Sequence, residues 1–411
     1  MSEQDIDRYA LAPEVEAERL RSLAQLHVFR SPPEDRYAHI THMACTVLGV
    51  PLSAILFIDE DSQWCKQFSG DIEPDFDVPR SDSACRATIA RAYHVGPDDL
   101  AVIHENLAET EFAQLPAVAA EGGVRFYASH PLFGPGGHPV GTFCVYDFTP
   151  RQISAKDKKI FAELAAWAQR ELANSNDLQR AADVQRQLLP APLGGLPGYS
   201  LTTVFTPAFS VAGDFYDHYP VPGGLNVTVA DVMGKGLGSA IVAATVRSAL
   251  RASSQGFDRD GHHLDLSAAI ESVDEMLVDD FSRTDTFVTL FHLYLESDTG
   301  LVSYIDAGHG IAALLRRSGE IEGLRSDDLP LGTSFGSTWQ TRAVAMHPGD
   351  MLVIASDGLL DLLDDHAVVD DALQFLAAHS GPAQLCSAVA KLTETRLATD
   401  DITIVALRRE G

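Results

Sequence analysis

Apolar residues recur every three or four positions near the start of the chain, which is the spacing of an amphipathic helix. "EAERLRSLAQLHVF" has this spacing, and "EDRYAHITHMACTVLG" repeats it after a Ser-Pro-Pro break, so helix is predicted over residues 17–45 with one interruption. After residue 50 the helical spacing of the apolar residues ends, and short apolar segments separated by turn residues follow. "PLSAILFIDEDSQWCKQFSG" and "RFYASHPLFGPGGHPVGTFCVYDFTP" each predict two strands joined by a turn. A mixed α+β domain is expected in this half of the chain.

A long polar helix is predicted over residues 154–189, where Ala, Gln, Glu, Lys and Arg dominate and "PAPLGGLPG" follows. Five apolar residues share one heptad seam: Leu164, Trp167, Leu178, Ala181 and Leu188. Polar residues, namely Glu171, Asn174 and Gln185, occupy the other positions of that seam, so a coiled coil formed here would be weak. Two outcomes stay open: pairing with a second copy, or a solvated helix packed on its own domain.

Short apolar and β-branched segments dominate after Tyr199 and predict strands. They are "LTTVFTPA", "LNVTVADV", "TFVTLFHLYLE", "GLVSYIDAG", "AALLRR", "DMLVIASDG" and "DITIVALRR". Helices are predicted over residues 237–251, 266–278 and 370–396. Because most strands follow one another as hairpins, with the helices set apart, antiparallel sheets covered by helices are expected.

Composition narrows the class of protein. A chain of 411 residues exceeds one compact core, and at about 150 residues per domain it predicts two domains. Its formal charge of −28 repels nucleic-acid phosphates and anionic lipids, so neither a nucleic-acid nor a membrane partner is expected. No apolar run approaches the ~20 residues of a membrane span, and the acidic N-terminus lacks the order of a secretory signal. A cytoplasmic location is therefore predicted.

The cysteines favour free thiols over a disulfide framework or a zinc site. The five cysteines, Cys45, Cys65, Cys85, Cys144 and Cys386, are scattered and contain no CxxC pair. Most are expected to be buried. Cys85 and Arg91 have the C-x₅-R spacing of cysteine phosphatases, but "CRATIAR" holds no glycine to wrap backbone amides around a phosphate, so a helix with a buried cysteine is expected instead.

Carboxylates stand at the edges of strong strands in the second half. They are Asp214 in "VAGDFYDHY", Asp231 in "VTVADVMGKG", Asp357 in "LVIASDGLLD", and Asp400 with Asp401 in "ATDDITIVAL". Oxygen ligands without His or Cys nearby suit Mg²⁺ or Mn²⁺ rather than zinc. Carboxylates that converge repel one another, a repulsion that two divalent cations offset, and two such ions activate water and clamp a phosphate. Two-metal phosphoryl hydrolysis is predicted, with turn chemistry as the alternative at any one position.

Two neighbouring motifs have other interpretations. "GKGLGS" suggests a nucleotide loop, but a P-loop ends in Gly-Lys-Ser/Thr, and here Gly236 follows Lys235, so Lys235 is expected to be an accessory residue at most. His309 in "DAGHG" could donate a proton to a leaving oxygen, although a single histidine at a tight turn is more often structural. Both roles of His309 stay open.

Five motifs occur in a fixed order between residues 211 and 409: "VAGDFYD", "ADVMGKGLGSA", "DAGHG", "SDGLLD" and "DDITIVALRR". Together they resemble the metal-dependent PPM protein phosphatases, in the bacterial branch that contains the stage-two sporulation protein E phosphatase and the stress-response sigma-factor regulators. The resemblance implies an α-β-β-α sandwich over residues 197–411, two Mn²⁺ or Mg²⁺ ions, and hydrolysis of phosphoserine or phosphothreonine.

The resemblance also implies a set of catalytic metal ligands. Asp231 corresponds to the carboxylate shared by both ions, and the carbonyl of Val232 to a further ligand. Asp214 and Asp357 correspond to ligands of one ion or the other, and Asp400 to the ligand of the last motif.

Other residues are expected to support these ligands. Asp401 is expected to orient Asp400, and backbone amides near Gly234 and Gly236 to contact the substrate phosphate, because this branch lacks the phosphate-binding arginine of its eukaryotic relatives. Ala212 and Asp361 depart from common family residues without removing a ligand.

The N-terminal half resembles a GAF domain over residues 17–172, which leaves residues 173–196 as a helical linker. This resemblance implies an antiparallel sheet with flanking helices and a pocket whose ligand is not specified. Four residues could line that pocket or belong to the core: Trp64, Cys65, Phe126 and Tyr127. A small molecule, or a redox signal at Cys65 or Cys85, is a possible input.

Taken together, the motifs predict a signal-regulated serine/threonine phosphatase that forms a homodimer through the linker helix. The resemblance implies that its substrate is a phosphorylated STAS-domain anti-sigma-factor antagonist in a stress-response pathway of partner switching. Two alternatives remain: a catalytically silent PPM-fold docking module with a GAF sensor, and a hydrolase of small phosphoesters.

Overall fold

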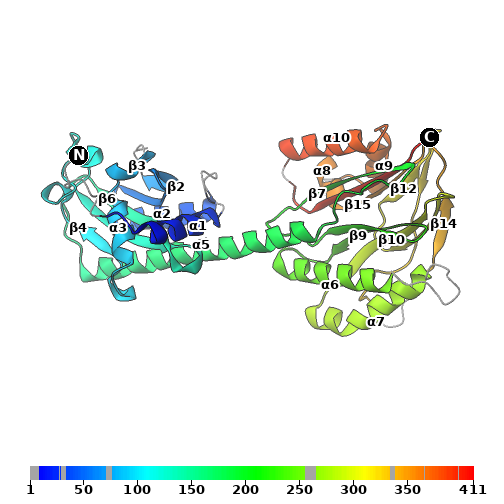
Figure 1. The fold of residues 1–411 in the computed structure, drawn as a ribbon, viewed down its shortest axis with the longest axis horizontal. Coiled ribbons are helices and arrows are strands. Elements are labelled where there is room, and N and C mark those ends of the chain that lie inside the picture. The colour runs from blue at the N-terminus through cyan, green and yellow to red at the C-terminus, as the bar shows by residue number, and fades with distance from the viewer. Residues whose placement is uncertain are drawn as a thin grey trace. The chain divides into compact units, whose positions relative to one another are not determined.

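The computed structural model describes residues 9–26, 28, 34–70, 76–254, 265–333, 338–364, 366–396 and 398–411. The chain divides into two compact units, Met1–Asp177 and Leu178–Gly411, which are described separately (Figure 1). The predicted domain borders at residues 172/173 and 196/197 stay predictions. The Ser-Pro-Pro break predicted at residues 31–33 lies outside the described residues.

The first unit is built on one antiparallel sheet in the order β3-β2-β1-β6-β5-β4. Its helices and strands are α1 Pro13–Ala24, α2 Asp35–Leu48, β1 Leu52–Ile58, β2 Ser62–Gly70, β3 Val78–Pro79, α3 Cys85–Ala92, β4 Val102–His104, α4 Pro116–Ala119, β5 Phe126–Phe133, β6 Pro139–Asp147 and α5 Ala155–Leu188. The last of these, α5, begins in the first unit and ends in the second.

Both faces of this sheet are covered, which explains the uninterrupted apolar sequence of β1. Ile55 and Phe57 pack with α1, α2 and α5 in one core, while Ala54 and Leu56 pack with α3 in a second core. Alternate residues of a strand point to opposite faces, so a strand buried on both sides needs apolar residues throughout. Leu164, from the predicted heptad seam of α5, is buried in the first core.

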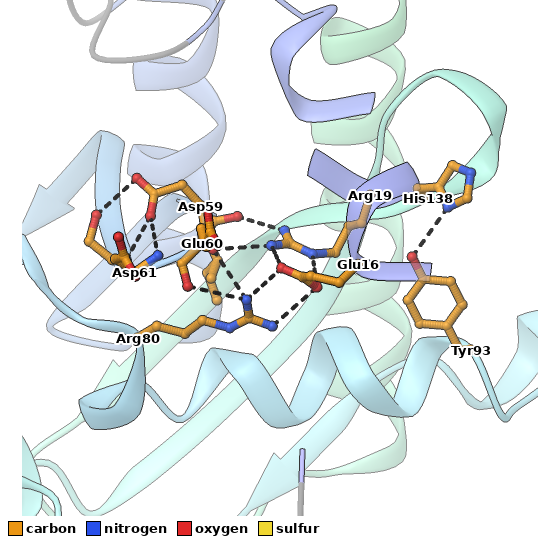
Figure 2. Close-up of polar contacts among 10 residues, drawn as sticks. Glu16, Arg19, Asp59, Glu60, Asp61, Arg80, Tyr93 and His138 are labelled. Carbon is orange, nitrogen blue, oxygen red and sulfur yellow. Dashed lines mark hydrogen bonds and ion pairs between the residues drawn. The ribbon is translucent and has the colours of Figure 1, made fainter. Parts of the chain in front are cut away.

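A buried ion-pair network fixes α1 to the turn between β1 and β2 (Figure 2). The fully buried Arg19 donates to the carbonyls of Ile58 at 2.6 Å and Asp59 at 3.1 Å, and it pairs with Glu16 at 2.6 Å. Arg80 contacts the same Glu16 carboxylate at 2.6 Å. One carboxylate therefore lies between two guanidinium groups, and Arg19 also donates to two backbone carbonyls at the end of β1 and in the turn.

The second unit is a sandwich of two antiparallel five-stranded sheets, β14-β11-β10-β9-β8 and β13-β12-β15-β16-β7. Its elements are β7 Tyr199–Thr206, β8 Phe215–Val221, β9 Gly224–Val232, α6 Leu237–Ser253, α7 Leu266–Thr284, β10 Val288–Glu296, β11 Leu301–Ala307, β12 Ala312–Leu315, β13 Ile321–Gly323, β14 Arg342–Ala345, β15 Met351–Ala355, α8 Gly358–Leu363, α9 Val369–Ala377, α10 Pro382–Thr395 and β16 Ile402–Arg409.

Three apolar cores hold this unit together. Residues such as Val229, Phe291, Leu352 and Val405 fill the space between the sheets. A second core joins the outer face of one sheet to α6 and α7, and a third joins the outer face of the other to α8, α9 and α10 (Figure 1). The expected α-β-β-α layering, and the α+β class of the whole chain, are confirmed.

Some predicted elements were wrong or missing. The single helix predicted over residues 370–396 is two helices, α9 and α10, because Gly381 and Pro382 interrupt it and proline then begins the second helix. The strands β3, β4, β8, β13 and β14 and the helices α4 and α8 were not predicted, because each is short or lies beside a turn-rich motif. Within the described residues, no helix is both long and apolar enough to span a membrane.

Replacing Arg19 tests the ion-pair network. Arg19→Met is expected to cost on the order of 3 kcal/mol of unfolding free energy, because it leaves the Glu16 carboxylate and two backbone carbonyls with fewer partners. Urea unfolding of the full chain, followed by hydrogen exchange in α1, measures this cost. Arg21→Met, at an exposed position of the same helix, is the control and should change stability by less than about 0.5 kcal/mol.

The same network predicts a loss of stability in acid. Burial raises the pKa of Glu16, but the hydrogen bonds and charges of Arg19 and Arg80 outweigh burial and lower it to about 2 from an ordinary 4.5. The folded pKa is depressed, so this stabilisation is present above pH 4.5 and disappears as the pH falls toward about 2. In Arg19→Met this acid dependence should shrink, and an unchanged dependence would contradict the assignment.

Candidate functional site

The predicted carboxylates come from neighbouring strand ends in each sheet. In one sheet, Asp231 lies near the end of β9 and Asp214 directly precedes the antiparallel β8, whose Phe215 pairs with Ala230. In the other, Asp357 follows β15 and Asp400 precedes the antiparallel β16. The end of one strand and the start of its antiparallel neighbour share one sheet edge, so each sheet contributes two aspartates at the same edge.

Asp401 joins the two sheet edges. Its buried carboxylate accepts hydrogen bonds from the backbone N–H of Gly213 at 2.7 Å and of Ala208 at 2.8 Å, in the loop before Asp214. Its own backbone N–H donates to Oδ1 of Asp400 at 2.9 Å. Asp401 therefore fixes Asp400 through its backbone, while its side chain holds the loop that carries Asp214.

Gly358 lets the backbone at the start of α8 lie close to the backbone of Asp401. A Cβ atom on Gly358 would lie 2.1 Å from the carbonyl oxygen of Asp401, a distance that no side chain can occupy. Gly358 begins α8 directly after Asp357, so its lack of a side chain lets Asp357 lie beside the entry to β16.

The aspartates raise one another's pKa. Burial raises the pKa of Asp214 well above its ordinary value, and the charge of Asp231 adds to this. Burial, followed by the charges of Asp357 and Asp400, raises the pKa of Asp231 to about 6. Burial and the charge of Asp400 likewise raise the pKa of Asp357. Carboxylates from both sheets therefore share one electrostatic environment.

The donor atoms fit a hard divalent cation such as Mn²⁺ or Mg²⁺. Oδ2 of Asp214 is buried and has no hydrogen-bond partner among the residues that the structure describes, a costly arrangement that a cation would satisfy. The surrounding donors are carboxylate and carbonyl oxygens, which these ions prefer. As placed, however, no three His, Cys, Asp or Glu side chains in the described part of the chain form a group that could hold an ion. The ligand set from the sequence stays a prediction.

The turn after β9 carries a lysine whose contacts the sequence did not reveal. Gly234 and Gly236 have φ values of +99° and +84°, which glycine adopts far more readily than other residues. Between them, Lys235 places its Nζ 2.9 Å from Oδ2 of Asp400 and donates to the carbonyl of Thr399 at 2.7 Å. Lys235 therefore bridges the turn of one sheet to the strand entry of the other, a larger role than an accessory residue.

His309 is buried below this edge. Its Nδ1 lies 3.4 Å from Oγ1 of Thr289, the residue that pairs with Asp231 across β10 and β9. Its Nε2 has no hydrogen-bond partner within the described ranges. Burial lowers the pKa of His309 to about 4, so the ring is neutral near pH 7. The carboxylate of Asp306 accepts from the His309 backbone N–H at 2.8 Å and fixes the turn. These contacts favour the structural role of His309.

The end of α5 contacts the loop of Asp214 within the second unit. The side chain of Gln185 donates to the Ala212 carbonyl at 2.7 Å and accepts from the Ala212 N–H at 2.9 Å. A cavity of about 330 Å³ lies beside this contact, lined mainly by apolar residues of α5 and α6 and reaching Asp214. The sequence shows Gln185 only as a polar residue in the heptad seam, because no local pattern encodes a contact with Ala212, 27 residues away.

Family comparisons match both halves of the chain. "Stage II sporulation protein E (SpoIIE)" matches residues 222–410, and "GAF domain" matches residues 32–172. The first match contains Asp231, Asp357 and Asp400, whereas Asp214 precedes its start.

Two curated relatives resemble the chain. Protein IcfG of Synechocystis sp. is 28% identical over 221 residues, which are 48% of this chain and 34% of IcfG. Phosphoserine phosphatase RsbU of Bacillus subtilis is 24% identical over 244 residues, or 57% of this chain and 70% of RsbU. Among solved structures, the SiaA-PP2C domain of Pseudomonas aeruginosa is 22% identical, with a TM-score of 0.49, over 59% of this chain and 98% of that domain.

The match to IcfG spans only about a third of that relative, so its activity as a whole does not transfer to this chain. The two family matches cover different halves, and the second unit has the α-β-β-α layering that the motifs implied. Residues 32–172 therefore match a GAF domain, and residues 222–410 match SpoIIE, the family of phosphatases that the motifs of the second half resemble.

Proposed function

We propose that the protein is a cytoplasmic, signal-regulated protein serine/threonine phosphatase that depends on two Mn²⁺ or Mg²⁺ ions. The observation that carries the proposal is the set of aspartates at the strand ends of both sheets, together with a buried carboxylate oxygen of Asp214 that has no hydrogen-bond partner in the described part of the chain. A purely structural cluster would be expected to pair these charges with nearby cations. Among the described residues, however, Lys235 pairs with Asp400 and not with Asp214, Asp231 or Asp357.

The predicted ligands are Asp214, Asp231, the carbonyl of Val232, Asp357 and Asp400. Bound divalent cations would lower the pKa of a water molecule there and neutralise charge on the phosphoryl group. The chain's own residues orient the reactants. Asp401 holds the Asp214 loop, and the exposed turn at Gly234 and Gly236 presents backbone amides that suit the phosphate.

The substrate that we propose is a phosphorylated STAS-domain protein, an anti-sigma-factor antagonist of the stress response. The relative RsbU is named a phosphoserine phosphatase, and the resemblance of the motifs to sigma-factor regulators supports the same substrate class here. Removal of the phosphate would let the antagonist capture its anti-sigma factor. Transcription would then change without this acidic chain binding DNA.

Regulation is proposed to act through the linker helix in a homodimer. Val184 and Leu188 near the end of α5 are exposed, and they line the apolar cavity beside α6. Gln185 between them contacts the loop of Asp214. A signal received by the GAF domain could therefore alter the position of the Asp214 carboxylate by moving the end of α5.

Asp231→Asn tests the reaction. The substitution removes one negative charge from the predicted shared ligand, so Mn²⁺-dependent phosphate release should fall roughly 100-fold, about 2.7 kcal/mol of transition-state stabilisation. Asp279→Asn, at an exposed position of α7, is the control and should retain activity. Chelation should abolish the wild-type activity and added Mn²⁺ restore it. If the full-length wild type shows no metal-dependent turnover, the docking-module alternative is favoured.

Gly358→Ala tests the geometry of the site without changing a ligand. The new Cβ would displace the Asp401 carbonyl and with it Asp357 and Asp400, so activity should fall at least roughly 10-fold. Gly238→Ala in α6 is the matched control, since a Cβ there meets nothing within 4 Å. Circular dichroism and steady-state phosphate release separate misfolding from a displaced site. Equal activities of the two variants would show that the site does not require the short distance between Gly358 and the Asp401 carbonyl.

The substrate and the regulation can be tested together. Phosphate release from a phosphorylated STAS protein is compared with release from nucleotides and from a small phosphoester, using the full chain and residues 178–411. Preference for the phosphoprotein and a different rate in the shorter chain are expected. Faster hydrolysis of the small substrates would favour the phosphoesterase alternative, and equal rates of the two chains would reject regulation through the linker.

A further inference from the structure

Two cysteines of the first unit lie together in the core that contains α3. Cys85 is the first residue of α3, Cys144 lies in β6, and their Sγ atoms are 3.6 Å apart. Both side chains are buried, with exposed fractions of 2% and 0%. All five cysteines are free thiols, but Cys45, Cys65 and Cys386 are only half-buried, so the expectation that most are buried holds for this pair alone.

Polar groups surround these sulfur atoms in an otherwise apolar core. The hydroxyl of Tyr127 donates to Sγ of Cys85 at 3.1 Å, and the thiol of Cys144 donates to Oγ1 of Thr142 at 3.2 Å. The backbone N–H of Cys85 donates to Oγ of Ser83 at 3.1 Å, which fixes the start of the helix. Cys85 is therefore an acceptor of hydrogen bonds, and Cys144 is a donor.

The two thiols differ in acidity. Burial raises the pKa of Cys85, but hydrogen bonds from Cys144, Thr142, Tyr127 and Ser83 outweigh burial and lower it to about 6. Burial raises the pKa of Cys144 well above its ordinary value. The two sulfur atoms are in contact, and their surroundings favour the thiolate form at Cys85 and the thiol form at Cys144. This is the arrangement of an attacking and a resolving cysteine.

A cavity lies beside Cys85, one member of this pair. It has a volume of about 150 Å³, and its lining includes Cys85, Tyr127, Gln63 and Asp82 among apolar side chains. Of the four residues predicted for a pocket, Tyr127 lines this cavity, whereas Trp64 and Phe126 lie in the other core of the sheet. Its volume accommodates a molecule as small as hydrogen peroxide beside Sγ of Cys85.

We propose that Cys85 and Cys144 form an oxidisable dithiol site that reacts with small hydroperoxides. The Cys85 thiolate attacks a peroxide oxygen, the S–O bond forms, the O–O bond breaks, and the leaving oxygen takes a proton to give water or an alcohol. The Cys144 thiol then attacks the sulfur of the Cys85 sulfenic acid, so that an S–S bond forms and the S–O bond breaks. The hydroxyl takes the proton of the Cys144 thiol and leaves as water. The two thiols lose two electrons in total, and the peroxide gains them.

Two of the other cysteines, Cys65 and Cys386, are expected to react with peroxide more slowly than Cys85. Burial raises the pKa of Cys65 to about 12 and that of Cys386 to about 11, so both are almost entirely protonated near pH 7. Because the thiolate is the nucleophile, these residues should react more slowly. The inference does not depend on the phosphatase activity, and its test does not measure that activity.

The test uses the reduced full-length chain and hydrogen peroxide at pH 7. Remaining thiols are blocked with N-ethylmaleimide at timed intervals, and peptides are analysed by mass spectrometry without reduction. A peptide pair linked through Cys85 and Cys144 is expected, forming roughly tenfold faster than Cys65 or Cys386 is oxidised. Its rate should level off above about pH 6, the pKa of Cys85. The proposal is overturned if the pair stays reduced while other cysteines react.

Two variants separate the steps. In Cys144→Ala the sulfenic acid of Cys85 should persist and be trapped by dimedone, because no resolving thiol is present. Tyr127→Phe removes the hydroxyl that donates to Cys85 and should slow the first step several-fold, whereas Tyr93→Phe, whose hydroxyl contacts His138, is the matched control and should not. If the Cys85–Cys144 disulfide appears only after urea unfolding, the site is not reactive in the folded protein.

Discussion

Electrostatic repulsion among carboxylates is the constraint that the second unit must withstand. Aspartates from both sheets raise one another's pKa, and Oδ2 of Asp214 is buried without a partner. Such a cluster would move apart if the backbone around it could yield. The backbone is fixed instead by strand pairing in both sheets and by a closely packed core between them, so the repulsion persists in the fold.

Asp401 and Gly358 show how the two sheets are kept in contact at this edge. The Asp401 carboxylate makes two short hydrogen bonds to backbone N–H groups of the loop before Asp214, and such bonds to a charged acceptor contribute about 1.5–3 kcal/mol each. On the other side, the absence of a side chain at Gly358 removes a clash with the carbonyl of the same Asp401. A residue that is not itself a predicted ligand therefore positions three that are.

The sequence was sufficient for the parts of the structure that depend on local pattern. Strand alternation and turn residues predicted the antiparallel sheets, and they placed each aspartate at the end of a strand, where the structure also has it. The sequence did not predict contacts between residues that are far apart in the chain. Lys235 with Asp400, Gln185 with Ala212, and Cys85 with Cys144 are each joined only by the tertiary fold, and no residue spacing encodes them. The break between α9 and α10, in contrast, does have a local signal in the sequence, namely Gly381 and Pro382. The apolar periodicity on both sides of these residues nevertheless predicted one continuous helix.

The link between α5 and the Asp214 loop has a strength that suits regulation. Two hydrogen bonds join Gln185 to Ala212, and neutral bonds of this kind contribute about 1 kcal/mol each. That total lies within the range of about 1–3 kcal/mol that couples distant sites in proteins. If these hydrogen bonds were much stronger, a signal could not break or shift them. If they were much weaker, a movement of α5 would not change the position of Asp214. Ala212 is only two residues from Asp214. A displacement of Gln185 that moves Ala212 would therefore also move the Asp214 carboxylate.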